Sequence, residues 1–255
     1  MRARVVSLAF LLVVLSGCGA GAQSAATTTP LTGSITVFAA ASLIAAFQSI
    51  GGAFEKLHPG ARVQFNFGGS STLVTQITEG APGDLFASAD QPNMQKLAEA
   101  SLASGSPQLF ARNKLQIVVA AGNPKGVSGL ADLARSGTVV VLCAPAVPCG
   151  NYAGQALARA GVKVTAASQE QDVKAVVSKV ALGEADAGIV YVTDVKAGGT
   201  KVQGVTIPDS QNVIASYPIT LLKGTQNTKL ARAFMDYLLS SSGQKTLGGF
   251  GFASP

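Results

Sequence analysis

Small polar residues stand at the points in this chain where a predicted strand passes into a helix. Ser42 follows an apolar run over residues 35–41 and is expected to cap a helix that begins at Leu43. Ser70 follows a second strand, residues 62–67, and a pair of glycines. The first N–H groups of a helix lack partners within the helix and carry partial positive charge, so they attract anions. Each serine alone is explained as a helix cap, but the repeated junction predicts an anion site.

A third junction of this kind contains two of the three cysteines. A predicted strand over residues 138–143 ends in Cys143, and a loop with two prolines leads through Cys149 to a helix over residues 151–160. An even pair of cysteines in an exported protein predicts a disulfide, and a pair of free thiols is the alternative. A metal site is not expected, because the chain has a single histidine and these cysteines lack further ligands.

Two further positions fit a ligand site at the ends of strands. Asp172 is expected to cap a helix that starts at Val173. Tyr191 ends a predicted strand over residues 187–191, and ligands of α/β sheets bind beyond the carboxyl ends of the strands. Taken alone, Tyr191 is more simply explained as a core aromatic whose hydroxyl reaches solvent.

Strands and helices alternate from residue 34 to about residue 115, which predicts an α/β fold with mainly parallel strands. An apolar strand over residues 115–121 is expected to cross from one lobe to another, and a strand over residues 216–222 to return. A final amphipathic helix is predicted over residues 229–240.

The composition is that of a compact globular protein of one or two lobes, with 255 residues of which 47% are hydrophobic and 13% charged. The formal net charge of +6 falls to +4 once Arg2 and Arg4 are removed with a leader. No run of basic residues interleaved with aromatics occurs, so nucleic acid is not an expected partner. Asp84 is expected to be structural, because a carboxylate facing the site would repel an anion.

Residues 1–17 have the features of a bacterial lipoprotein signal peptide. Basic residues precede an apolar run over residues 5–15, which is too short for a permanent membrane span. The sequence Leu-Ser-Gly-Cys ending at Cys18 resembles a lipobox, which predicts cleavage before Cys18 and a lipid on its sulfur; an ordinary signal peptide is the alternative. Residues 18–33 are expected to form a flexible tether. We therefore expect an extracytoplasmic protein that is held on the cell membrane by a lipid anchor.

Signatures of catalysis are absent from the sequence. It contains no G-x-S-x-G elbow, no phosphate-binding G-x-x-x-x-G-K-[ST] loop and no H-E-x-x-H motif. A serine hydrolase using Ser42 or Ser70 is a remote alternative, because the only histidine, His58, is expected at a helix end beside Pro59. We therefore expect a protein that is not an enzyme.

The chain resembles the molybdate-binding solute receptors of ABC importers in six motifs that occur in the same order and spacing: ITVFAAASL, FGGSSTL, GAPGDLFASAD, VPCG, QDVKAVV and GIVYVTD. The resemblance covers about residues 34–255. It implies a type II periplasmic-binding-protein fold, in which two α/β lobes joined by two crossing strands hold an oxyanion between them. We place lobe 1 at residues 34–117 and 217–255, and lobe 2 at residues 118–216.

The family's anion contacts, carried onto this sequence, fall on Ser42, Ser70, Cys149, Val173 and Tyr191. The resemblance implies that the serines and Tyr191 donate O–H groups, and that Cys149 and Val173 donate backbone N–H groups. The family often has Ala at the position of Cys149, and since only the amide is needed, the cysteine is compatible with binding.

Molybdate is a fully ionised dianion, so a ring of donors without an acceptor suits it. Tungstate has nearly the same size and is expected to bind too. Sulfate meets the same description and is the alternative ligand, whereas phosphate is partly protonated near neutrality and needs an acceptor. The resemblance further implies a monomer without a cofactor that delivers its ligand to the membrane permease of an ABC importer.

Overall fold

The computed structural model describes residues 30–255. The predicted signal peptide, the lipidation site Cys18 and most of the predicted tether lie outside the described residues. The elements follow in the order β1 Gly33–Ala40, α1 Ile44–Leu57, β2 Ala61–Gly68, α2 Ser70–Thr78, β3 Leu85–Ala87, α3 Gln91–Glu99, β4 Ala103–Ala120, β5 Val140–Cys143, α4 Pro148–Ala160, β6 Ser168–Glu170, α5 Val173–Ala181, β7 Ala187–Tyr191, α6 Val192–Gly198, β8 Val202–Thr206, β9 Ile214–Leu222, α7 Thr228–Leu239 and α8 Ser241–Phe250.

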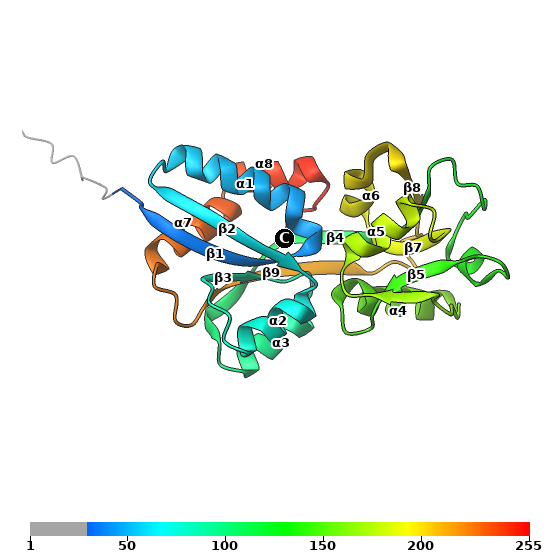
Figure 1. The fold of residues 1–255 in the computed structure, drawn as a ribbon, viewed down its shortest axis with the longest axis horizontal. Helices are drawn as coiled ribbons and strands as arrows, with labels where there is room; N and C mark the ends of the chain where they lie inside the picture. The colour runs from blue at the N-terminus through cyan, green and yellow to red at the C-terminus, as the bar shows by residue number, and fades with distance from the viewer. Residues whose placement is uncertain (1–29) are drawn as a thin grey trace, which may run out of the picture.

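The first lobe is built on β1, which lies between β2 and β3 and runs parallel to both. Helices α1 and α8 lie on one side of this sheet, and α2 and α3 lie on the other (Figure 1). Aromatic rings fill the space under α1: Phe47 and Phe54 each pack against Phe234 of α7. The apolar residues of α1 therefore pack into the core of the lobe.

The second lobe repeats the arrangement with β5 between β6 and β7, parallel to both. Strands β7 and β8 each pair antiparallel with β4. Helix α4 lies on one side of this sheet, and α5 and α6 lie on the other (Figure 1). Val176 and Val180 of α5 are fully buried, so this face of the helix packs into the core of the lobe.

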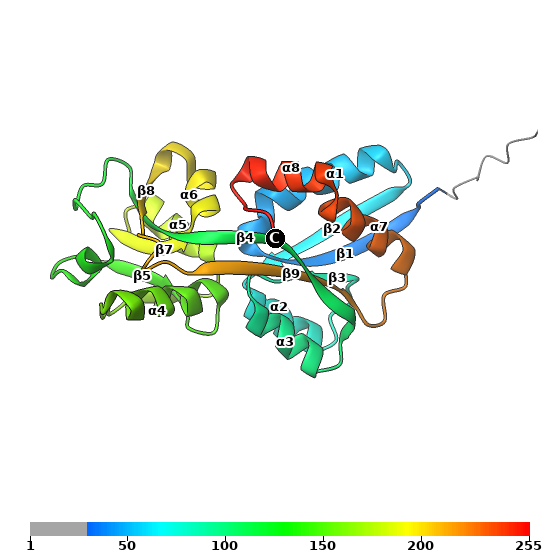
Figure 2. The same cartoon turned by 180° about the vertical axis from the view of Figure 1, so that it is seen from behind.

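Two strands run from one lobe to the other. Strand β4 is 18 residues long; it pairs with β9 as far as Lys114 and with β7 from Leu115 onward. Strand β9 lies beside it, and the two views show both strands spanning the gap between the lobes (Figures 1 and 2). The predicted architecture of two lobes joined by two crossing strands is confirmed, while the residues at which we divide the lobes stay a prediction.

Some elements differ from the sequence predictions. Helix α1 begins at Ile44, and a 3-10 turn over Ala41–Leu43 precedes it, so the prediction of Ser42 as a helix cap is wrong. Strand β4 begins at Ala103, well before residue 115. The sequence does not predict this first part, because its residues are polar and mostly exposed and so show no apolar alternation. Helix α8 was not predicted, since its glycines weaken the helical pattern. Among residues 30–255, no helix combines the length and apolar character needed to cross a membrane.

Candidate anion-binding site

The strand registers of the first lobe bring two junctions together. Ala40 at the end of β1 pairs with Gly68 at the end of β2, and β3 ends beside them, with Ala87 paired to Ala39. Because parallel strands with aligned ends release their chains at the same edge of the sheet, Ser42 and Ser70 emerge side by side. Both side chains are buried.

The second lobe places its own junctions in the same way. Cys143 at the end of β5 pairs with Glu170 at the end of β6, and β7 runs parallel to β5 and ends at Tyr191. Helix α4 starts after β5 and helix α5 starts after β6, so the N-termini of both helices lie near Tyr191. The carboxyl edges of the two sheets therefore face one another across the gap between the lobes.

A small pocket with an empty volume of about 200 Å³ lies where these edges meet. All five predicted contact residues line it, together with neighbouring backbone from both lobes: Ala40, Ala41, Ser42, Gly68, Gly69, Ser70, Ala89, Val147, Pro148, Cys149, Val173 and Tyr191. The lining contains no lysine, arginine or carboxylate. The pocket is thus surrounded by neutral groups, and the contact of each with a ligand stays a prediction.

The lobes are closed over this pocket. Gly69 of lobe 1 lies so near the backbone carbonyl of Gln171 in lobe 2 that a Cβ at position 69 would overlap that oxygen, and Val147 stands 3.6 Å from the same point. Only glycine permits this approach of backbone to backbone. The second glycine of FGGSSTL is therefore a contact between the lobes.

The two serine hydroxyls already hold one hydrogen bond each within the protein. Ser42 Oγ lies 3.1 Å from the phenol oxygen of Tyr217, and Ser70 Oγ accepts the backbone N–H of Ala89 at 3.0 Å. A hydroxyl that accepts one bond keeps its own hydrogen to donate. Ser70 is therefore available to the pocket as a donor.

The hydroxyl of Tyr191 is the polar atom of the site that lacks a partner. Its side chain is 1% exposed, and its oxygen makes no hydrogen bond with any of residues 30–255. Burial, with a smaller contribution from neighbouring Tyr217, raises the pKa of Tyr191 well above its ordinary value, so the phenol keeps its proton. A buried hydroxyl without a partner is costly, and a ligand in the pocket would remove that cost.

The backbone donors of lobe 2 are placed by the starts of two helices. Helix α4 begins at Pro148, which has no N–H, so the amide of Cys149 is the first free donor of that helix. A disulfide joins Cys149 to Cys143 and confirms the predicted pairing. Helix α5 begins at Val173, and Asp172 caps it as predicted by accepting the N–H of Ala175 at 3.0 Å.

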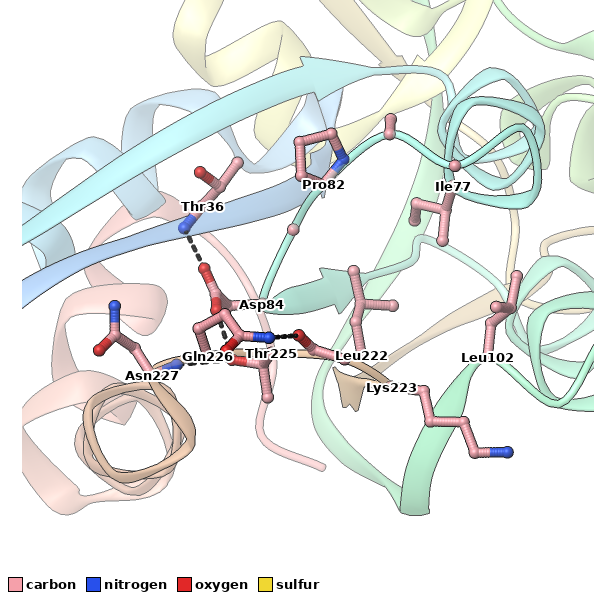
Figure 3. A pocket seen from close by; sticks show the side chains of 14 residues that line it. Thr36, Ile77, Pro82, Asp84, Leu102, Leu222, Lys223, Thr225, Gln226 and Asn227 are labelled. Carbon is pink, nitrogen blue, oxygen red and sulfur yellow. Dashed lines mark hydrogen bonds between the residues drawn. The ribbon is translucent and has the colours of Figure 1, made fainter.

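A larger hollow of about 900 Å³ lies in the first lobe, beside the start of β3 and the end of β9, and shares no residue with the small pocket (Figure 3). Its polar centre is Asp84, whose carboxylate accepts the N–H of Thr36 at 2.7 Å and the hydroxyl of Thr225. Asp84 is structural, as predicted, and its negative charge makes this hollow a poor place for an anion. The small pocket between the lobes is therefore the candidate site.

Neither serine has the surroundings of a catalytic nucleophile. His58 directly follows the C-terminus of α1 and packs on Phe54, with ring centroids 4.6 Å apart. The 14 residues of α1 separate it from Ser42 by roughly 20 Å. No cluster of three or more His, Cys, Asp or Glu side chains suited to a metal occurs within residues 30–255.

Sequence reasoning missed three residues that shape the site. The glycine pair before Ser70 gives no sign that Gly69 contacts the other lobe, because its partner Gln171 is remote in the chain. Tyr217 and Asn113 lie behind Ser42 on the crossing strands, outside every motif. No local signal distinguishes them, because Tyr217 occupies an apolar position of an ordinary strand pattern.

Comparisons with known proteins agree with this geometry. Residues 35–253 match the model of a family described as bacterial extracellular solute-binding proteins. The molybdate-binding protein ModA of Mycobacterium tuberculosis is 43% identical over 249 residues, which are 97% of this chain and 95% of that protein.

Two solved structures share the fold. The periplasmic molybdate-binding protein of Azotobacter vinelandii superposes with a TM-score of 0.76 at 23% identity, covering 87% of this chain and 99% of that one. The sulfate-binding protein SubI of Mycobacterium tuberculosis gives 0.77 at 21% identity, covering 87% and 86%. At such identities they support the type II periplasmic-binding-protein fold and do not distinguish the ligands. The chain belongs to the family of bacterial extracellular solute-binding proteins.

Proposed function

We propose that this protein binds molybdate or tungstate between its lobes and delivers the oxyanion, as a monomer, to the membrane permease of an ABC importer. The observation that carries the proposal is the buried, unpartnered hydroxyl of Tyr191 in a pocket of neutral donors. The 43% identity to a protein named for molybdate binding supports the choice of ligand.

The donors that we assign to the oxyanion are the hydroxyls of Ser42, Ser70 and Tyr191 and the amides of Cys149 and Val173. Such donors spread the charge of a dianion without a buried ion pair, and the starts of α4 and α5 add partial positive charge. No group lining the pocket is a carboxylate that could accept a proton from a ligand. The set therefore suits an oxyanion that has lost all its protons.

Isothermal titration of the mature protein with molybdate, tungstate, sulfate and phosphate tests the assignment. We expect molybdate and tungstate to bind with similar affinity, sulfate more weakly and phosphate weakest. Sulfate binding more tightly than molybdate would replace this proposal with the sulfate alternative, which the fold shared with SubI allows.

We also propose that the mature chain begins at a lipid-modified Cys18 and remains on the outer side of the cell membrane. The lipobox-like sequence before Cys18 supports this proposal. Mass spectrometry of the protein from its native membrane should find an N-terminal diacylglyceryl cysteine, and Cys18→Ala should release the protein from membranes. Soluble wild-type protein that is cleaved elsewhere would contradict it.

A further inference from the structure

A chain of buried polar groups lies behind Ser42, on the two crossing strands. Tyr217 belongs to β9 and Asn113 to β4, and both are buried. The phenol oxygen of Tyr217 lies 3.1 Å from Ser42 Oγ, and Asn113 Nδ2 lies 3.5 Å from that phenol oxygen. Neither Tyr217 nor Asn113 lines the pocket, so they can affect a ligand only through their neighbours. Two neighbours of Tyr217 line the pocket: Ser42, by a hydrogen bond, and Tyr191, by ring packing.

The donor and the acceptor of each hydrogen bond in this chain of groups follow from the bond farthest from Ser42, which is made by Asn113. The backbone N–H of Lys114 donates to Asn113 Oδ1 at 3.0 Å, and a backbone N–H can only donate. The other end of the Asn113 amide is therefore its NH₂ group, which donates to Thr193 Oγ1 at 2.9 Å and to Tyr217. Tyr217 accepts from Asn113, so its own hydrogen is left for Ser42 Oγ. Ser42 then accepts, and its hydrogen is free for the pocket.

The ring of Tyr217 is held in the position that this direction requires. Its neighbours Phe110, Tyr191 and Phe252 contact it edge-on, with ring centroids 5.4–6.2 Å away. Burial raises the pKa of Tyr217, which keeps the phenol protonated. The hydroxyl therefore stays beside Ser42 and keeps its hydrogen to give.

Ser70 is oriented in the same way, but by a single hydrogen bond. The backbone N–H of Ala89 donates directly to Ser70 Oγ at 3.0 Å. In both cases a backbone N–H, which cannot reverse its role, determines that a serine hydroxyl donates toward the pocket. A protonated oxyanion needs one acceptor for its proton, and a single serine free to turn its lone pair toward the ligand would supply it.

We propose that Tyr217, oriented by Asn113, is a specificity-determining positioning residue that holds Ser42 as a donor and thereby excludes oxyanions that still carry a proton. This inference rests on the proposed function, because it assumes that the oxyanion lies against Ser42.

Selenate and hydrogen arsenate provide the test, because both are tetrahedral dianions of nearly equal size at mildly alkaline pH and differ by one proton. Their affinities are measured by competition against molybdate for the wild type, Tyr217→Phe, Ser42→Ala and the double variant. Tyr237→Phe is the matched control, since Tyr237 lies in α7 away from the pocket. Thermal melting verifies that each variant is folded.

We expect the wild type to prefer selenate, and Tyr217→Phe to reduce that preference roughly tenfold, because the freed Ser42 can accept a proton. Molybdate affinity should also fall roughly tenfold, since Ser42 no longer points its hydrogen inward. In the Ser42→Ala background, Tyr217→Phe should change neither quantity, and Tyr237→Phe should match the wild type.

Three results would overturn the inference. The preference for selenate over arsenate could stay unchanged in Tyr217→Phe, or arsenate could still fail to compete measurably in that variant. The third is that Tyr217→Phe lowers this preference equally in the Ser42→Ala background. The last result would assign Tyr217 a purely structural role. Should Tyr217→Phe fail to fold, Asn113→Ala leaves the tyrosine in place but removes its fixed donor, and the same loss of preference is expected. A wild type that binds no molybdate would instead refute the proposed function, and the selenate-to-arsenate ratio, then measured by direct calorimetric titration of each anion, would still report on Tyr217.

Discussion

The two halves of the pocket are built on the same local geometry but offer different donors. Lobe 1 presents the side-chain hydroxyls of Ser42 and Ser70, each of which already holds an internal hydrogen bond. Lobe 2 presents the backbone amides of Cys149 and Val173 at two helix starts, and one hydroxyl, that of Tyr191. Under the proposed assignment, the amino-acid identity therefore matters in lobe 1, whereas in much of lobe 2 only the path of the backbone matters.

Under the same assignment, a cysteine at position 149 is expected to be compatible with binding. The side chain of Cys149 is turned away into a disulfide with Cys143, and its amide is placed by the start of α4. A serine in lobe 1 has no such freedom in the proposed site, because its hydroxyl is itself the donor that we assign. Substitutions that remove either a backbone donor or a side-chain donor therefore test this difference between the lobes.

The largest loss of molybdate affinity is expected from a substitution at the contact between the two lobes. Gly69→Ala would place a Cβ against the carbonyl of Gln171 and so hold the lobes apart. Because the donors of lobe 2 could then no longer reach the ligand, we expect molybdate affinity to fall by at least about 100-fold. Titration calorimetry measures the loss. The melting temperature of the ligand-free protein should hardly change, since the clash lies between the lobes and not within the core of either one.

Gly52→Ala is the matched control for that change. Nothing lies within 4 Å of a Cβ at Gly52, a position inside α1, so affinity should be that of the wild type. A contrasting variant is Gly150→Ala, whose Cβ would overlap the carbonyl of Ala144 within lobe 2 and should lower the melting temperature. If Gly69→Ala bound molybdate within about threefold of the wild type, closure onto Gln171 would not be part of binding.

The next largest loss of molybdate affinity is expected at Tyr191, the one side-chain donor that we assign to lobe 2. Tyr191→Phe removes a hydroxyl that has no partner among the described residues, so the folded protein should lose no stability. A hydrogen bond to a charged group contributes about 1.5–3 kcal/mol, which predicts a loss of molybdate affinity of roughly 10- to 100-fold. Calorimetry with Tyr237→Phe as control measures it. Unchanged affinity would show that Tyr191 does not contact the oxyanion.

The sequence predicts where the junctions lie because their signals are local, whereas the assignment of ligand donors rests on the family resemblance. A strand, a small residue and a helix start lie within a few positions of one another at Ser70 and Val173, and their helices begin there. Ser42 shows the limit of this logic. The residue is in the predicted place, but its side chain bonds to Tyr217, which is 175 positions away, instead of capping α1.

What the sequence could not predict depends on contacts between distant segments. Gly69 meets Gln171 only because two lobes close, and Asn113 meets Tyr217 only because β4 and β9 pair in one register. The first part of β4 was missed for a different reason. It is exposed and polar, so only its pairing with β9 defines it as a strand.

A proline substitution tests whether lobe 2 acts through its backbone. Val173 is the first residue of α5, where proline is well tolerated, and the extended conformation of Asp172 suits a following proline. Val173→Pro removes the N–H and should weaken molybdate binding roughly tenfold, as measured by calorimetry. Val173→Ala keeps the N–H and should bind like the wild type. Equal losses in both variants would mean that the valine side chain, and not its amide, matters.

The smallest effect on binding is expected from the disulfide. Replacing Cys143 and Cys149 together by alanine removes a bridge across six positions, which should cost at most about 2–3 kcal/mol of stability and lower the melting temperature. Molybdate affinity should fall only about threefold, because the amide of Cys149 remains. The loop is also held by hydrogen bonds from Ala144 N–H to Glu170 and from Val147 N–H to Ala144, both 2.9 Å.

Thiol labelling separates the bridge from its effect on binding. The unreduced mature protein should react at neither Cys143 nor Cys149, and both should label after reduction and unfolding. If the double alanine variant lost about 100-fold in molybdate affinity while keeping its fold, the disulfide would be needed to orient the backbone amide at position 149. Lobe 2 would then depend on side-chain chemistry as much as lobe 1 does, and the contrast between the two halves of the pocket would not hold.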